Sequence, residues 1–176
     1  GKIVDIGCGY GFLSIMLNLM SKEREILGID YDDEKISIAN NCLSKSDKLN
    51  FVCADVTAYN FEKSDAFIIN DVLHYFSTEK QIQLIETCIK QLNPKGILII
   101  RDADASMQKQ HRFTKLTEFF STKFGFNKTE GNLHFFSSTL IIDVINKFPN
   151  LSYQKISDSA ITSNNIFVIT NNNNGK

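Results

Sequence analysis

The sequence predicts an α/β fold, a three-layer sandwich in which helices cover both faces of a mostly parallel, seven-stranded sheet. Short apolar runs alternate along the chain with segments whose apolar residues recur at helical spacing,. Several of these runs are continuously apolar, which is typical of parallel strands buried on both faces. Two strand-like segments near the end of the chain are close enough to pair antiparallel. We therefore expect the last strand to run antiparallel to the others.

The first half of the chain reads as alternating strands and helices. An apolar run opens it without a leader, so we expect the chain to be a piece of a longer protein. Residues 12–21 form a helical pattern with an apolar face from Phe12 to Leu19,. Asp32 supplies an N-cap for a second helix that reaches about Ser44,. Strands of this half are expected at Lys2–Ile6, Glu25–Asp30, Leu49–Cys53 and Asp65–Asn70.

The second half completes the predicted sheet. A helix is expected over Thr78–Leu92, with Thr78 and Gln81 at capping-box spacing, and Asn93–Gly96 breaks it,. Another helix is expected over Ser137–Phe148. The remaining strands are expected at Ile97–Ile100, Leu151–Ser157 and Asn165–Thr170, in one domain over residues 1–170, followed by a disordered polar tail over 171–176,.

Composition points to one globular domain and excludes several classes of protein. The 176 residues are 43% hydrophobic and 22% charged, which suits one core, since single cores commonly serve roughly 100–200 residues. A net charge of -1 provides no global field for nucleic acid or anionic lipid,. The four cysteines lie far apart and include no C-x-x-C pair, which argues against a disulfide framework or zinc knuckle,. With neither a run of about 18 apolar residues nor a signal segment, a cytoplasmic location is expected.

A glycine-rich turn after the first strand is the sharpest signal. Gly7, Gly9 and Gly11 stand between a strand and a helix, in the run Val4-Asp5-Ile6-Gly7-Cys8-Gly9-Tyr10-Gly11. Glycine permits positive φ angles and lets a ligand approach the backbone closely. In the dinucleotide fingerprint G-x-G-x-x-G the third glycine would stand at position 12, where this chain has Phe12,. That shift speaks against a nicotinamide-dependent dehydrogenase.

The form D-x-G-x-G-x-G resembles motif I of the class I, Rossmann-like methyltransferases that use S-adenosylmethionine. Further along the chain, Asp65–Phe76 resembles motif IV of that family, and Leu92–Leu98 resembles the turn before its fifth strand. These matches follow the family's order through most of the chain. The resemblance implies S-adenosyl-L-methionine as cofactor and methyl transfer to a small-molecule acceptor as reaction.

The resemblance also implies roles for individual residues. Asp30 stands where the family binds both ribose hydroxyls with an acid, a bidentate and charge-assisted contact, and helping to cap the following helix is its alternative role,. Asp55 and the backbone of Val56 stand where the adenine edge is read. Tyr31 would pack on the adenine or lie on the surface, and Asp5 would support the cofactor's amino group or only brace the loop. The expected cofactor-binding set is Asp5, Gly7, Gly9, Gly11, Asp30, Tyr31, Asp55, Val56 and Asn70, the last meeting the methionine portion.

Methyl transfer requires a nucleophile in line with the methyl group and the exclusion of water. A phenolic or acidic acceptor must also lose its proton, for which histidine is suited. His74, four residues after the fourth predicted strand, is the best-placed catalytic candidate, and a structural role beside the cofactor is the alternative. Asp102, Asp104 and His111 are further candidates at the same end of the sheet. None of the histidines has close-spaced partners of the zinc-ligand kind, so no metal is expected,.

A narrower resemblance concerns the part after the fifth strand. Arg101–Asp104 and Lys115–Thr122 resemble the methyltransferase module of large bacterial fusion proteins that also carry a transporter and a lipid acyltransferase. This implies an aromatic or lipid-like acceptor. Met107–Phe136 mixes phenylalanines with lysines and arginine, and we expect a lid-like insertion at about residues 105–136, with ordinary core packing as the alternative,.

The sequence is compatible with two other functions. A domain that binds S-adenosylmethionine to regulate or scaffold a larger protein would keep the same glycine turn and acids. A nicotinamide-dependent oxidoreductase would share the strand, the glycine turn and Asp30. A nucleic-acid partner is not expected, because the Asn/Asp-Pro-Pro-Tyr/Phe signature is absent after the fourth predicted strand.

Overall fold

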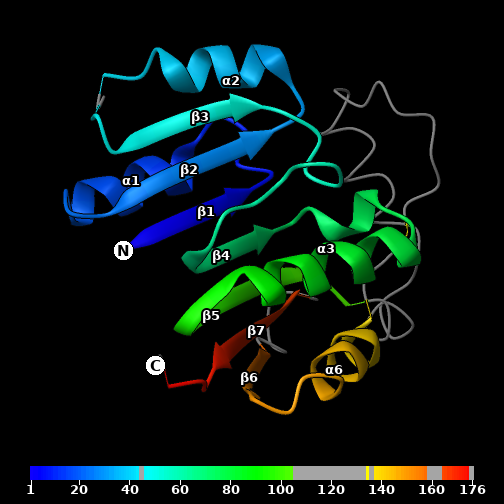
Figure 1. Cartoon of the computed structure of the whole chain (residues 1–176). Helices are drawn as coiled ribbons and strands as arrows, with labels where there is room; N and C mark the ends of the chain where they lie inside the picture. Colours follow the sequence, from blue (N-terminus) through cyan, green and yellow to red (C-terminus); the bar gives the residue numbers. More distant parts are fainter. Residues whose placement is uncertain (44–45, 105–133, 135–136, 158–163, 175–176) are drawn as a thin grey trace.

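A seven-stranded sheet runs through the computed structural model in the order β3-β2-β1-β4-β5-β7-β6 (Figure 1). The structure describes residues 1–43, 46–104, 134, 137–157 and 164–174. Strand β7 pairs antiparallel with both β5 and β6, and the first five strands pair parallel. This confirms the predicted fold class. The strands are β1 (Lys2–Ile6), β2 (Glu25–Asp30), β3 (Leu49–Cys53), β4 (Ser64–Asn70), β5 (Leu92–Ala103), β6 (Leu151–Ser157) and β7 (Asn164–Asn171).

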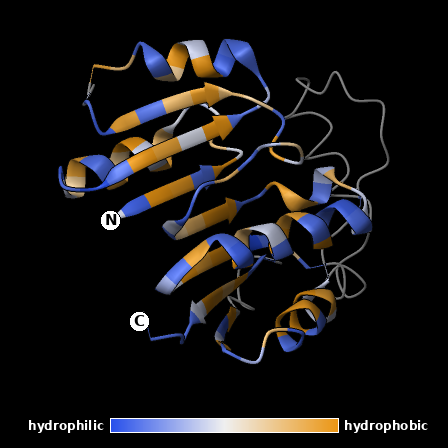
Figure 2. Cartoon of the chain, viewed as in Figure 1, coloured by the Kyte–Doolittle hydropathy of each residue, from blue (hydrophilic) through white to orange (hydrophobic). Residues whose placement is uncertain are grey.

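Helices flank this sheet on both faces. Helices α3 and α6 lie in front of it in Figure 1, and α1 lies behind. Figure 2 shows hydrophobic residues along the central strands and many hydrophilic residues on α3. The helical elements are α1 (Phe12–Met20), α2 (Asp33–Asn40), the 3-10 helix η1 (Leu73–Tyr75), α3 (Thr78–Gln91) and α6 (Ser138–Asn146).

The main core fills the space between the sheet and the α3–α6 layer. Alternate strand residues face these helices, because side chains along a strand point to opposite faces in turn. Phe67, Leu98 and Phe167 are each 0% exposed on this face. Ile85 of α3 and Ile141 of α6 meet them in the same buried cluster. Burial on this scale makes the α3–α6 side the principal source of hydrophobic stabilisation.

Helix α1 departs from the sequence prediction. Three of the four residues of its expected core face are exposed, at 78% for Phe12, 54% for Met16 and 55% for Leu19, whereas Ser14 and Asn18 are buried. The fourth, Ile15, packs partly buried against the core, as predicted. The helix follows Gly11, whose φ is 75°, and the Ser14 hydroxyl donates to the buried carboxylate of Asp5 at 2.7 Å. This bond fixes the rotation of the helix about its axis and directs the Ser14 side towards the sheet.

The α3–β5 junction also differs from the prediction. Ser77, not Thr78, caps α3, accepting from the Lys80 amide at 3.4 Å. The expected break at Asn93–Gly96 lies inside β5, which starts at Leu92. A φ of 62° at Lys95 and a register shift opposite β4 absorb the irregularity.

Strand β7 extends through Asn171, one residue into the predicted tail. The Asn171 side-chain amide donates to the Asn93 carbonyl at 3.1 Å, which ties this end of β7 to β5. The predicted insertion at about 105–136 lies outside the described residues, apart from His134.

Candidate functional site

The carboxyl ends of β1, β2, β3 and β4 meet at one edge of the sheet, where their arrowheads point in Figure 1. The strand order reverses between β1 and β4, which lie side by side although they are not consecutive. Ligands of open α/β sheets bind in the crevice at such a switch point. The glycine turn leaves β1 at this place, and Asp30 and Asn70 are the last residues of β2 and β4.

All three glycines of the turn adopt positive φ angles, 69° at Gly7, 55° at Gly9 and 75° at Gly11. A Cβ at Gly7 would lie 2.2 Å from a methyl group of Val72, and one at Gly11 would lie 2.5 Å from the ring of Phe51. A Cβ at Gly9 would meet nothing within 4 Å. Packing therefore requires glycine at the outer two positions, and Gly9 borders open space that a ligand can enter.

Asp30 joins the glycine turn to the end of β2. Its side chain is buried, with one oxygen accepting from the Gly9 amide at 2.8 Å and the other from the Asp32 amide at 3.0 Å. A carboxylate oxygen has more than one acceptor direction, so each can still receive a hydroxyl. Asp32 in turn caps α2, accepting from the Glu34 and Lys35 amides.

Asp5 lies beneath the turn and is 2% exposed. Burial raises the pKa of its carboxyl group, and the hydrogen bond from Ser14 acts in the opposite direction. The described contacts of Asp5 thus connect β1 to α1. They support the loop-bracing alternative for this residue.

The residues expected to surround adenine follow β2 and β3. The Ala54 amide donates to the Asp30 carbonyl at 2.9 Å and holds the two strand ends together. Asp55 is exposed and accepts from the amide and the hydroxyl of Thr57, which lower the pKa of its carboxyl group. Tyr31 is 55% exposed and Val56 is buried.

Asn70 belongs to a polar cluster at the ends of β4 and β5 that includes two residues absent from the predicted set. An Arg101 guanidinium nitrogen contacts the Asp71 carboxylate and lies 3.4 Å from the Asn70 side-chain oxygen. Asp71 has a φ of 56°, uncommon for a residue other than glycine,. Its burial raises the pKa of its carboxyl group, although Arg101 opposes the shift. Sequence spacing gave no sign of this pair, because 30 residues separate its members.

The structure brings His74 and Asp102 together. His74 Nδ1 lies 2.8 Å from an oxygen of Asp102, and the two side chains are only 6% and 0% exposed. Asp104 lies in a separate group with Asn165, whose amide donates to it at 2.8 Å. His111 lies outside the described residues.

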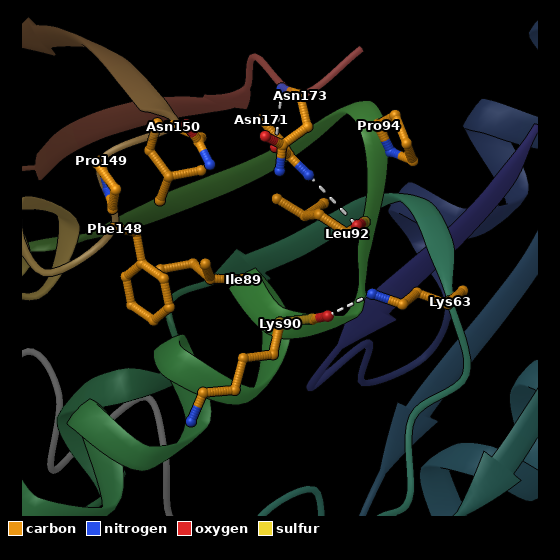
Figure 3. Close-up of a pocket in the computed structure, with 11 residues that line it drawn as sticks. Lys63, Ile89, Lys90, Leu92, Pro94, Phe148, Pro149, Asn150, Asn171 and Asn173 are labelled. Atoms are coloured by element: carbon orange, nitrogen blue, oxygen red, sulfur yellow. Dashed lines mark hydrogen bonds between the residues drawn. The ribbon is translucent and has the colours of Figure 1, made fainter. Parts of the chain in front are cut away.

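A cavity of about 340 Å³ lies elsewhere, at the carboxyl end of α3 and the start of β5 (Figure 3). Ile89, Leu92 and Phe148 give it an apolar lining, and the Lys63 ammonium donates to the Lys90 carbonyl at its rim. The amino-terminal start of β5 is at the opposite end of the strand from Arg101 and Asp102. The cavity is therefore not part of the candidate site.

Two features are absent from the part of the chain that the structure describes. They contain no cluster of three histidine, cysteine or acidic side chains arranged to hold a metal ion. No helix among them has the length and apolar character needed to cross a membrane.

Known proteins resemble this chain in sequence and in fold. It is 27% identical over 135 residues to carboxy-S-adenosyl-L-methionine synthase of Trichodesmium erythraeum, covering 73% of this chain and 53% of the relative. The plantazolicin methyltransferase BamL, solved with a triazolic desmethylPZN analog and S-adenosylhomocysteine, superposes with a TM-score of 0.72 at 17% identity, over 98% of this chain and 77% of BamL. The N-methyltransferase NodS of Bradyrhizobium japonicum, in complex with S-adenosylhomocysteine, superposes with a TM-score of 0.72 at 15% identity, over 98% of this chain and 79% of NodS. At these identities the structures show a shared fold.

The chain spans about half the length of the curated relatives it matches. Within it, the model of the methyltransferase domain family matches residues 3–96, from β1 through the glycine turn and the acids to the start of β5. Because this match covers more than half of the 176 residues, the chain belongs to the methyltransferase domain family.

Proposed function

We propose that this chain binds S-adenosyl-L-methionine at the carboxyl ends of β1 to β4 and transfers its methyl group to a small-molecule acceptor. The observation that carries the proposal is the Asp30 carboxylate, buried at the tip of β2 and bonded to the Gly9 amide at 2.8 Å. An acid in this position can bind a ribose diol while Gly9 leaves room for the ligand,. Similar folds in BamL and NodS, both solved with S-adenosylhomocysteine, support the choice of cofactor.

In this proposal, the ends of successive strands bind successive parts of the cofactor. Asp30 binds the ribose, and Asp55, Val56 and Tyr31 surround the adenine. Asn70 meets the methionine portion at the end of β4. Asp5, Gly7 and Gly11 shape the turn by packing, as their burial and close neighbours indicate.

The sulfonium of the cofactor supplies its own leaving group, so no covalent protein nucleophile is required. The protein has to align the acceptor with the methyl group and keep water away from it. His74, buried after β4, is the group proposed to take the acceptor's proton,.

Replacing Asp30 tests the cofactor site. Asp30→Ala removes a charged acceptor, so we expect S-adenosylmethionine affinity to fall by about 2–3 kcal/mol in titration calorimetry. Asp33→Ala, which removes an exposed acid from the first turn of α2, is the matched control and should leave affinity unchanged. Thermal melts of both variants verify the fold. Equal affinity of wild type and Asp30→Ala would remove Asp30 from the site.

For the acceptor we propose an aromatic or lipid-like small molecule. Support comes from the resemblance of Arg101–Asp104 and Lys115–Thr122 to the modules of transporter and acyltransferase fusion proteins. Release of S-adenosylhomocysteine in the presence of fractionated cell extract tests it. Turnover is expected with the fraction that dissolves in organic solvent, which holds pigments and lipids. Turnover confined to the aqueous fraction would contradict the proposed acceptor class.

The curated relatives favour a second candidate, synthesis of a carboxylated cofactor, because several are carboxy-S-adenosyl-L-methionine synthases. Mass spectrometry of the nucleoside products separates the two activities. Methyl transfer yields S-adenosylhomocysteine, and the second candidate yields carboxy-S-adenosylmethionine. A protein that binds the cofactor and forms neither product would be a regulatory or scaffold domain.

A further inference from the structure

A buried histidine and a buried carboxylate form a pair at the carboxyl ends of β4 and β5. His74 lies in η1, which follows β4, and Asp102 lies near the carboxyl end of β5. The Nδ1–oxygen distance is 2.8 Å, and neither side chain is more than 6% exposed. Val72, the residue before η1, packs against Gly7 of the glycine turn. The pair therefore lies beside the turn proposed to hold the cofactor.

The contacts of Asp102 decide which ring nitrogen carries a proton. One carboxylate oxygen accepts from the Ala103 amide at 2.8 Å, and the other lies 3.4 Å from the His74 amide. Asp102 is thus a hydrogen-bond acceptor towards the backbone groups around it. An ionised carboxylate can only accept, so the nitrogen facing it must be the donor, Nδ1–H.

We infer that Asp102 is a positioning residue that holds His74 in the Nδ1–H form, so that Nε2 removes the proton of a hydroxyl acceptor during methyl transfer. This inference rests on the proposed function and extends it to the class of acceptor. Ionised groups placed this way fix both the tautomer and the orientation of an imidazole.

The proton and electron balance is complete without a further reactant. The acceptor oxygen forms a bond to the methyl carbon, and the carbon–sulfur bond breaks with its electron pair remaining on sulfur. The acceptor's proton passes to His74 Nε2, giving an imidazolium whose Nδ1–H remains bonded to Asp102. Methyl ether and S-adenosylhomocysteine leave, and the imidazolium returns its proton to solvent.

The backbone around the pair is held by neighbouring elements. The Gln81 side-chain amide, from α3, donates to the Leu73 and Phe76 carbonyls at 3.0 Å, on either side of His74. The His134 amide donates to the His74 carbonyl at 3.0 Å. These bonds restrict η1, so the ring is presented in one orientation.

Other charged groups lie close enough to affect the pair. Asp71 interacts electrostatically with both His74 and Asp102, and it is itself paired with Arg101. The Tyr75 ring contacts the His74 ring at a tilt of 46°, with ring centroids 4.1 Å apart. Among the described residues Asp102 is the carboxylate in hydrogen-bond contact with the ring, which makes it the group whose removal should change the tautomer.

Nitrogen NMR on protein labelled with 15N-histidine tests the tautomer without any acceptor. His74→Gln assigns the signals. At alkaline pH we expect a protonated Nδ1 and an unprotonated Nε2 in the wild type. In Asp102→Asn the new amide can donate to Nδ1, so the tautomer should reverse. A wild type protonated on Nε2 would overturn the inference, and this measurement stands even if the variant does not fold.

Kinetics with a panel of para-substituted phenols tests the role in turnover. With S-adenosylmethionine saturating, kcat of Asp102→Asn should fall by about 10²–10⁴-fold with an unchanged KM for the cofactor. Asp102→Glu, which keeps an acceptor, should recover part of the loss. Asp65→Asn is the matched control, because this carboxylate lies at the amino end of β4, where it accepts from the Asn93 side chain and the Lys2 amide, and its kcat should not change.

Three results would overturn the inference or part of it. An unchanged kcat in Asp102→Asn removes Asp102 from proton transfer. Equal losses in Asp102→Asn and Asp65→Asn would indicate structural damage instead of positioning. If the wild type binds the cofactor but methylates no phenol, the assignment of a hydroxyl group as the acceptor is wrong. Failure to bind the cofactor in calorimetry, by contrast, would be a failure of the proposed function, which the NMR result does not share.

Discussion

At the scale of single residues, the buried carboxyl group of Asp5 makes the stability of the protein depend on pH. Its burial raises the pKa of the carboxyl group above the ordinary value of an aspartate. The folded state therefore holds the proton more tightly than the unfolded state does. Stability from this group is greatest below the unfolded pKa and is lost as pH rises through the folded pKa.

Asp5→Asn removes the charge and keeps an acceptor for the Ser14 hydroxyl. We expect the melting temperature of the variant, relative to wild type, to increase as the pH is raised from about 4 to 7, because only the wild type has to bury a charge. Calorimetric melts across this range provide the measurement. For a chain of this size each 1 kcal/mol corresponds to about 2–4 °C.

Asp65 supplies a control of opposite sign. Hydrogen bonds from the Asn93 side chain and the Lys2 amide lower the pKa of its carboxyl group. The advantage of wild type over Asp65→Asn should therefore shrink on acidification, when the carboxylate is protonated. If both variants responded to pH in the same direction, the assignment of the Asp5 shift to burial would be wrong.

The glycine turn allows ligand space and packing to be separated by substitution. Gly9→Ala should cost about 1–2 kcal/mol of stability from its positive φ and weaken cofactor binding, because the new methyl group occupies the open space,. Gly11→Ala should lose more stability, since its Cβ would lie 2.5 Å from the Phe51 ring. Chemical denaturation and calorimetry on both variants measure the two effects. Unchanged affinity in Gly9→Ala would mean that the turn only reverses the chain.

At the scale of elements, apolar periodicity located α1 but assigned three exposed residues, Phe12, Met16 and Leu19, to the core. Periodicity reports that a helix is amphipathic and says nothing of how neighbouring bonds rotate it. Here the buried Ser14–Asp5 bond turns the polar side inward. The strand predictions were more accurate. A continuously apolar run such as Ala66–Ile69 fits only a strand that is buried on both faces of the sheet,.

The exposed face of α1 gives a stability prediction. Met16→Gln should change the free energy of unfolding by no more than about 0.5 kcal/mol, since the side chain is 54% exposed,. Ile85→Ala, on the buried face of α3, is the comparison and should cost about 2–5 kcal/mol,. Urea denaturation distinguishes the two. A loss of several kcal/mol in Met16→Gln would mean that Met16 packs in the core, as the sequence pattern predicts.

At the scale of the whole molecule, the site divides into a local part that the sequence predicts and a distant part that it does not. Gly7, Gly9 and Asp30 follow from the glycine motif and its spacing to the next strand. The pairs His74–Asp102 and Asp71–Arg101 depend on the register of β4 against β5, in which Asn70 lies opposite Arg101. That register is set by a bulge and by Lys95, neither of which the sequence pattern indicates.

The position of β7 between β5 and β6 delays the pairing of these strands during synthesis. Synthesis proceeds from the amino end, so β5 and β6 leave the ribosome before the strand that joins them. Until Asn164–Asn171 emerges, β6 has no partner in the sheet and one edge of β5 is open. Unpaired edges are templates for aggregation, so the nascent chain is vulnerable in the interval between the synthesis of β6 and that of β7. A premature stop codon shortly before β7 would therefore remove two strands from the sheet, the missing one and β6.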